Sequence, residues 1–429
     1  MGKSRAFRFA VLALATLGVG TAYAGSPSLV VELESGRVLH ADRATDPWYP
    51  ASITKLMTVY VALDLVEAGQ ARMDQLLTVS EAAAALPPSK MAFKPGTQIR
   101  LDNALKIIMV KSANDVAATI AENLGGSIDG FATMMNEEAR RLGMRESRFV
   151  NPHGLPDDRN QTSARDMAIL GRALLTHFPE YQGLFEIGAI QYGRRIMRNT
   201  NGLIGRYPGA DGMKTGFICS AGFNVVASAT RNGRHLITVV LGAPSANERT
   251  MKAAELFDLG FNSPTSPSSY SLDTLPASVS QTPPDMRPLI CDRKGPMPQE
   301  ENLTTVGAEP ESTTPNLLSS PNVFAYAGAQ PQRTALGPRS AVEPVPVWIG
   351  LNPPSPAELA AQAAAEDAAD KARTTKSKKT VAAKSADQSR ASISIKPVSS
   401  TVKPAAKTPP KAPAKTSAKA SPKPATKAN

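Results

Sequence analysis

The sequence contains few of the residues that usually bind metal ions. Its 429 residues include only two cysteines, Cys219 and Cys291, and four histidines. The histidines are His40, His153, His177 and His235. They are too far apart along the chain to form a local ligand cluster, so we expect no metal and no other cofactor. The cysteine pair is compatible with one disulfide, which we favour, or with two separate buried thiols.

Long apolar runs are also absent, except near the N-terminus. Residues 9–19 are apolar but too few to span a bilayer comfortably. This run lies between the basic residues Lys3, Arg5 and Arg8 and the small-x-small triplet Ala22-Tyr23-Ala24. The pattern predicts a cleaved signal peptide over residues 1–24, rather than an uncleaved membrane anchor. We therefore expect the mature protein outside the cytoplasmic membrane, in the periplasm or cell envelope.

Acidic residues are nearly absent from the C-terminal segment. Residues 371–429 contain thirteen lysines and two arginines but a single acid, Asp387, and so carry +14. Residues 1–24 carry a further +3, so the rest of the chain is mildly acidic, at −6, although the whole chain is at +11. The basic character therefore belongs to the tail and not to a groove of the folded part.

The tail is rich in Lys, Ala, Pro, Thr and Ser, a composition that predicts disorder. It has no Trp- or Phe-bearing amphipathic face of the kind that binds membranes. Its lysines could lie against anionic lipid or another anionic polymer of the cell envelope. The alternative is a soluble spacer.

Periodicity and turn residues predict strands at both ends of the folded part and helices between them. Strands are expected over 29–33 and 37–41, and over 222–231 and 235–241 around Asn232-Gly233, a strong hairpin signal. Helices are expected over 52–68, 101–109, 115–124, 128–142, 164–177 and 247–259. This order predicts one mixed domain, residues 25–263, whose first and last strands meet. We expect residues 264–355 to be Pro/Ser-rich and mostly irregular, and residues 356–429 to form the basic disordered tail.

Three short motifs carry the candidate chemistry. The first is Ser52-Ile53-Thr54-Lys55, where a helix would place the lysine on the same face as the serine. The second is Ser112-Ala113-Asn114, between two predicted helices, and the third is Lys214-Thr215-Gly216, which we expect at the start of a strand ahead of the hairpin. Ser-x-x-Lys recurs at Ser400 and Ser-Ala-Asn recurs at Ser245, whereas Lys-Thr-Gly occurs once. The combination is therefore more specific than any single motif.

With these motifs the chain resembles the penicillin-recognising serine enzymes, and more narrowly the D-alanyl-D-alanine carboxypeptidases. The narrower resemblance lies in residues 49–58, 111–115, 151–155 and 211–217, and it covers about residues 26–261. It implies an α+β fold with a five-stranded antiparallel sheet flanked by helices. It also implies a peptidoglycan stem-peptide substrate and β-lactams as covalent inhibitors.

The resemblance also implies a role for each motif residue. Ser52 would attack the carbonyl of a terminal D-Ala-D-Ala bond and form an acyl-enzyme. Lys55 would act as its base, with its pKa lowered by burial and by Lys214. Ser112 would relay a proton to the leaving nitrogen, and Asn114 would hold the Lys55 amine and the substrate amide.

Further residues would bind the substrate. The backbone N–H groups of Ser52 and Phe217 would form the oxyanion hole, and Gly216 would let the substrate lie along the strand. Lys214, Thr215 and Arg249 would bind the terminal carboxylate, unless Arg249 is an ordinary surface arginine. We expect His153 to be a structural hydrogen-bonding residue near the site.

Other functions remain open at this point. A β-lactamase would need a carboxylate to activate water, and Glu180 is the one candidate between Asn114 and Lys214. A wall endopeptidase of the same fold would need no free carboxylate on its substrate, and Arg249 argues against this alternative. A non-catalytic protein could bind an anionic polymer through its basic tail, although export would separate it from cytoplasmic nucleic acid, so we expect no such partner.

Overall fold

A computed structural model describes residues 25–263, 270–293, 336–361 and 364. The chain divides into two units, residues 1–363 and 364–429, and nearly all described residues belong to the first. The predicted signal peptide and most of the predicted basic tail lie outside the described residues. Within the described ranges, no helix is long and apolar enough to cross a membrane.

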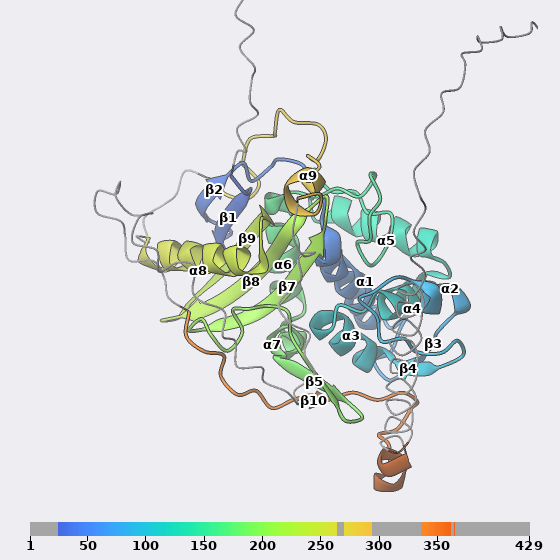
Figure 1. Cartoon of the computed structure of the whole chain (residues 1–429). Helices are drawn as coiled ribbons and strands as arrows, with labels where there is room; N and C mark the ends of the chain where they lie inside the picture. The colour runs from blue at the N-terminus through green and yellow to red at the C-terminus, as the bar shows by residue number, and fades with distance from the viewer. Residues whose placement is uncertain (1–24, 264–269, 294–335, 362–363, 365–429) are drawn as a thin grey trace, which may run out of the picture. The chain divides into compact units, whose positions relative to one another are not determined.

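Five antiparallel strands form the central sheet of the first unit (Figure 1). They are β1 (Ser28–Glu32), β2 (Val38–Asp42), β7 (Ala210–Ile218), β8 (Gly222–Arg231) and β9 (Arg234–Ala243), in the order β2-β1-β9-β8-β7. The predicted meeting of first and last strands is confirmed, because β1 pairs with β9 and Val30 lies opposite Thr238. The α+β fold with a five-stranded antiparallel sheet is likewise confirmed.

The β8–β9 hairpin forms where the sequence predicts it. Asn232 and Gly233 both have positive φ, 51° and 73°, as a two-residue turn between twisted strands requires. Most residues of both strands are buried, because helices cover both faces of the sheet.

Two helices, α6 (Ala164–His177) and α8 (Ala246–Asn262), cover the sheet. A Cβ on Gly171 of α6 would touch Ile237, whereas a Cβ on Gly260 of α8 would lie 2.8 Å from Leu236. Neighbouring residues of a strand point to opposite faces. The two helices therefore pack on opposite faces of the sheet (Figure 1).

The helical region contains the other predicted helices within about three residues of their expected bounds. These are α1 (Lys55–Glu67), α3 (Leu101–Val110), α4 (Asn114–Gly125) and α5 (Ile128–Arg141). Short elements that the sequence analysis did not predict are α2 (Glu81–Ala85), η2 (Pro179–Tyr181), α7 (Gly183–Glu186), and the strand pairs β3 (Leu76–Thr78) with β4 (Gln98–Arg100) and β5 (Ala189–Tyr192) with β6 (Arg195–Arg198). Every residue of α1 from Lys55 to Leu63 is buried. Packing on these residues therefore holds the N-terminal end of the helix in a fixed position.

One expectation about the sheet is wrong. Lys214-Thr215-Gly216 lies in the middle of β7, not at the start of a strand. Residues 210–213, with an aspartate and a glycine, lack the alternation that marks a strand in a sequence. Pairing with the strongly apolar β8 makes this segment extended, with Lys214 opposite Val226.

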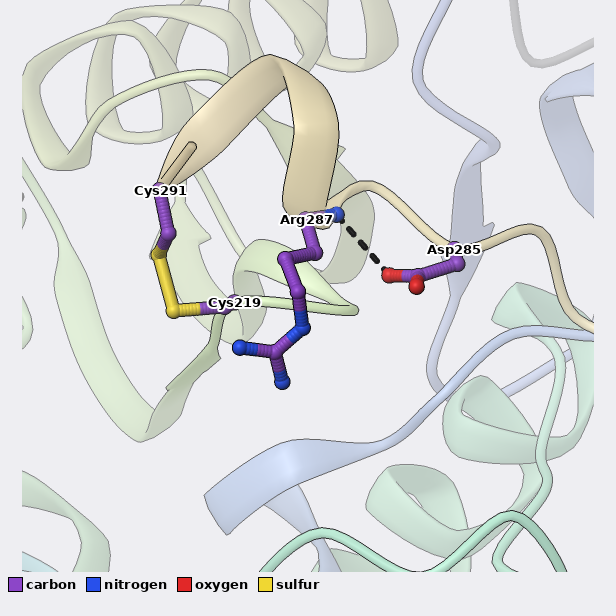
Figure 2. Close-up of a disulfide and its surroundings, with 4 residues drawn as sticks. All are labelled: Cys219, Asp285, Arg287 and Cys291. Atoms are coloured by element: carbon purple, nitrogen blue, oxygen red, sulfur yellow. Dashed lines mark hydrogen bonds between the residues drawn. A yellow bond between two sulfur atoms is a disulfide. The ribbon is translucent and has the colours of Figure 1, made fainter. Parts of the chain in front are cut away.

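Parts of the chain after residue 263 pack on the domain. Residues 270–293 include the short helix α9 (Arg287–Ile290), and a disulfide joins Cys291, which follows α9, to Cys219, which follows β7 (Figure 2). Two separate thiols are thus excluded. Figure 2 also shows the α9 entry, where the Arg287 backbone N–H donates to Asp285. In residues 336–361 the strand β10 (Val345–Pro346) pairs in parallel with β5.

Candidate active site

Ser52 lies in the 3₁₀ helix η1 (Ala51–Thr54), which leads directly into α1. The preceding residue, Ala51, has a positive φ of 50°, so the chain turns sharply just before the serine. Gly154 of the 151–155 loop lies against this turn, where a Cβ would come within 1.8 Å of the Ala51 carbonyl oxygen. Only glycine allows that approach, which brings the 151–155 loop next to the serine.

Lys55 is fully buried one turn after Ser52. Its Nζ donates to uncharged oxygens, among them Ser52 Oγ at 3.0 Å, Asn114 Oδ1 at 2.9 Å and the His153 carbonyl at 2.7 Å. The Ser52–Lys55 contact has the heavy-atom distance that direct proton transfer needs.

The second motif lies between α3 and α4. Ser112 has a φ of 60°, a strained conformation for a serine, and it is only 5% exposed. Its Oγ is buried and makes no hydrogen bond within the described part of the chain. Asn114, the first residue of α4, also donates from Nδ2 to the Pro87 carbonyl at 3.1 Å, which fixes its amide so that Oδ1 faces Lys55.

The third motif runs alongside the serine. A Cβ on Gly216 would lie 2.8 Å from the backbone nitrogen of Ser52 and 2.9 Å from that of Ile53. The middle of β7 therefore contacts η1 through backbone atoms. Phe217 is stacked on Phe223 with ring centroids 4.3 Å apart. Lys214 is fully buried, and its Nζ donates to the Thr215 carbonyl at 3.0 Å.

Arg249 is wholly buried in α8, so the surface-arginine alternative is wrong. Its Nη2 donates to the carbonyl of Thr200 at 3.2 Å, and its guanidinium lies 5.9 Å from the Phe223 ring. Thr200 Oγ1 is 2.6 Å from Thr215 Oγ1. Thr200 therefore links Arg249 to the third motif.

Thr200 is a residue that the sequence analysis missed. It lies in an irregular Asn-Thr-Asn segment after β6, and no motif or periodicity marks it. Only its contacts identify it.

His153 was expected to be a structural hydrogen-bonding residue. Its carbonyl accepts from Lys55, and its Nδ1 accepts from the Leu155 backbone N–H at 3.2 Å. Burial, together with the charge of Lys55, lowers the pKa of His153 to about 3. The imidazole is therefore neutral around pH 7 and adds no second charge beside Lys55.

A cavity of about 190 Å³ joins these features. Its lining includes Ser52, Ser112, Asn114, Thr200 and Phe217. A larger cavity, about 480 Å³, is lined by residues of α5, α6 and the 271–273 segment and includes none of the predicted site residues.

Glu180, the candidate for a β-lactamase carboxylate, is exposed in η2 and does not line the smaller cavity. Among the residues described, no three His, Cys, Asp or Glu side chains gather as metal ligands would.

Comparisons with known proteins agree with this arrangement. The sequence model of the D-alanyl-D-alanine carboxypeptidase family matches residues 19–245. D-alanyl-D-alanine carboxypeptidase DacF of Bacillus subtilis is 32% identical over 249 residues, which are 56% of this chain and 63% of that protein. The chain thus spans less than two thirds of that relative's length.

Two solved structures are similar to this one. Penicillin-binding protein 5 from Haemophilus influenzae is 32% identical with a TM-score of 0.53, and the match covers 56% of this chain and 71% of that chain. Penicillin-binding protein D2 from Listeria monocytogenes, in its ampicillin-bound form, is 27% identical with a TM-score of 0.51, covering 56% and 98%. The family match, the shared fold and the motif residues agree with one another: the chain belongs to the D-alanyl-D-alanine carboxypeptidase family.

Proposed function

We propose that this protein is a serine D-Ala-D-Ala carboxypeptidase that removes the terminal D-alanine from peptidoglycan stem peptides. One observation carries the proposal: Ser52 Oγ lies 3.0 Å from the Nζ of the fully buried Lys55, in a cavity that Ser112 and Asn114 also line. We assign the activity to residues 25–263.

In the proposed acylation step, Ser52 Oγ bonds to the carbonyl carbon of the D-Ala-D-Ala bond. Lys55, in its neutral form, accepts the hydroxyl proton. Ser112 then donates its hydroxyl proton to the nitrogen of the leaving D-alanine as the C–N bond breaks, and takes in return the proton that Lys55 received, so that Lys55 is neutral again. Water hydrolyses the resulting ester and releases the shortened peptide. The buried Ser112 Oγ, which has no hydrogen-bond partner among the described residues, supports this role, because a substrate amine would give it one.

The proposed oxyanion hole consists of the backbone N–H groups of Ser52 and Phe217. The close approach of Gly216 to the Ser52 nitrogen supports this assignment, because it places the two backbone segments against each other. Donors of this kind typically contribute about 3 kcal/mol each to lowering the barrier.

The proposed carboxylate subsite consists of Lys214, Thr215 and Arg249. Buried cations near a hydroxyl favour a free carboxylate over a neutral peptide group. This feature favours a carboxypeptidase over an endopeptidase of the same fold. Removing the cation of Arg249 should therefore weaken binding of a peptide acid more than binding of its amide.

Two alternative functions have less support than a carboxypeptidase. A β-lactamase needs a carboxylate that activates water, and Glu180 is exposed and does not line the cavity. A polymer-binding role of the basic tail falls outside the described residues. We infer that the tail, after export to the periplasm or cell envelope, binds an anionic polymer or membrane surface there, independently of the cavity.

β-Lactams should acylate the same serine, as the ampicillin-bound Listeria relative suggests. The test is to incubate the protein with a labelled penicillin and to follow the adduct by intact mass and peptide mapping. D-Alanine release from a stem peptide ending in D-Ala-D-Ala is measured in parallel. We expect a stable adduct on Ser52 and D-alanine release, and loss of both in Ser52→Ala.

The matched control is Ser35→Ala, an exposed serine in the β1–β2 turn, which should retain both activities. D-Alanine release that survives Ser52→Ala would refute the assignment of the nucleophile. Rapid penicillin turnover without an adduct would indicate a β-lactamase instead.

A further inference from the structure

A C-terminal segment, residues 336–351, lies across the catalytic domain and is here called the strap (orange in Figure 1). It is far in sequence from the motifs and was not predicted to touch the site. It begins beside the 199–207 loop and continues along β5 to the β3–β4 ribbon. The strap therefore connects the loop that carries Thr200 to the β3–β4 strand pair.

Arg339 is the strap residue that binds this loop on both sides of Thr200. Its Nη1 donates to the Asn199 carbonyl and its Nη2 to the Asn201 carbonyl, both at 3.1 Å. These two carbonyls flank Thr200 in the chain. The planar guanidinium thus binds two fixed acceptors at once, and a lysine ammonium cannot reproduce this geometry.

Further hydrogen bonds hold this end of the strap. The Ser340 backbone N–H donates to the Gly205 carbonyl at 2.8 Å, and Arg206 Nε donates to the Gly337 carbonyl at 3.0 Å. Arg206 belongs to the same loop, but its hydrogen bond does not involve the carbonyls that flank Thr200. It therefore attaches the strap at a second point of the loop.

The rest of the strap is attached independently. Val345 pairs with Ile190, and the Val347 backbone N–H donates to the Gln191 carbonyl at 2.9 Å. The Gly350 backbone N–H donates to the Gln98 carbonyl at 2.7 Å. Val347 is only 4% exposed. Arg339 is therefore held on a segment that is anchored well away from the loop.

Thr200 also contacts the proposed carboxylate subsite, so a loop held in place by Arg339 fixes those contacts as well. Its Oγ1 is 2.6 Å from Thr215 Oγ1, and its carbonyl accepts from Arg249. Its neighbour Asn201 donates from Nδ2 to the Gly212 carbonyl at 2.8 Å. The two groups that meet Thr200 are members of the proposed carboxylate subsite.

We propose that Arg339 is a positioning residue for recognition of the substrate's terminal carboxylate. By holding the carbonyls on both sides of Thr200, it fixes where the Thr215 hydroxyl and the Arg249 guanidinium lie. This inference rests on the proposed function for the identity of the substrate. The inference adds that the C-terminal strap determines the affinity for peptides with a free carboxylate. The reactivity of Ser52 and Lys55 does not depend on the strap.

The test compares Arg339→Ala, Arg339→Lys and the control Arg206→Ala in the full-length protein. With a peptide acid ending in D-Ala-D-Ala, Arg339→Ala should raise KM about tenfold and leave kcat within about twofold. The reason is that the bound substrate and the transition state lose the same binding energy. Arg339→Lys should recover only part of this effect. Arg206→Ala should leave KM unchanged.

A fluorophosphonate reacts with a serine nucleophile and has no carboxylate. Its labelling rate therefore measures the reactivity of Ser52 alone. All three variants should be labelled at the wild-type rate. An unchanged KM in Arg339→Ala, an equal rise in Arg206→Ala, or slower fluorophosphonate labelling of Arg339→Ala would each overturn the proposal.

A second measurement separates this proposal from the proposed function. Calorimetry of the Ser52→Ala background gives the Kd of the peptide acid and of its C-terminal amide. Arg339→Ala should reduce the preference for the acid about tenfold, in line with its effect on KM. If wild-type protein releases no D-alanine, the proposed function fails. A preference for the acid that Arg339→Ala leaves intact refutes the positioning role alone.

Discussion

Asn114 Oδ1 accepts a hydrogen bond of 2.9 Å from Lys55 Nζ, although 59 residues separate the two in the chain. The contact joins the first and second motifs into one site. It also orients the amine, because Asn114 is fixed in turn by the Pro87 carbonyl. Lys55 thus lies between Ser52 and Asn114, and its chemistry is the first thing to test.

Replacing Lys55 by arginine should greatly slow acylation although it keeps a positive charge. A guanidinium stays protonated and cannot accept the Ser52 proton. We expect the rate of labelling by penicillin to fall at least about 100-fold, the usual contribution of a positioned base. Lys90→Met is the control, since Lys90 binds the Ala84 carbonyl outside the cavity. Labelling of Lys55→Arg near the wild-type rate would rule out Lys55 as the base.

Gly216→Ala should also impair acylation, for a steric reason. The added Cβ would lie 2.8 Å from the Ser52 nitrogen, so β7 and η1 must separate. The displaced oxyanion donors should reduce the acylation rate about 100-fold. Gly183→Ala is the control, because its Cβ would meet nothing within 4 Å. If Gly216→Ala is acylated as fast as Gly183→Ala, the proposed oxyanion hole is wrong.

Removing the Cys219–Cys291 disulfide should destabilise the protein without stopping the chemistry. The bond closes a segment of 72 residues, so its loss should lower the free energy of unfolding by about 2–4 kcal/mol. We expect the Cys219→Ser/Cys291→Ser variant to melt at a lower temperature and to retain penicillin labelling. Dithiothreitol should lower the melting temperature of the wild type only. An equal effect of dithiothreitol on both proteins would contradict the prediction.

His153 should make stability depend on pH. Its pKa is about 3 in the folded protein, against 6.5 for an ordinary histidine. The unfolded chain therefore binds a proton that the folded protein does not, and stability present above pH 6.5 is lost as the pH falls toward 3. The loss from this residue should reach about 2 kcal/mol at pH 5.

Urea unfolding at pH 7 and pH 5 measures this effect. His153→Gln, which cannot titrate, should lose less stability between the two pH values than the wild type. The same loss in both proteins would show that other groups cause the pH dependence.

Local signals were sufficient to predict much of the fold. The hairpin at Asn232-Gly233 and helices such as α6 depend on turn residues and periodicity within a short stretch. The strand β7 was placed incorrectly around Lys214 because its first residues are not strand-like, and only its pairing with β8 makes them extended.

The sequence by itself determined which residue types are available for the chemistry, because a serine and a lysine three positions apart share one face of a helical turn. It also determined the main helices and the hairpin, since these depend on near neighbours. Only the tertiary structure decided that Thr200 links Thr215 to Arg249, and that Arg339 holds the loop beside it from 138 and 140 residues away. Contacts between residues so far apart depend on how whole elements pack, and no short stretch of sequence records that packing.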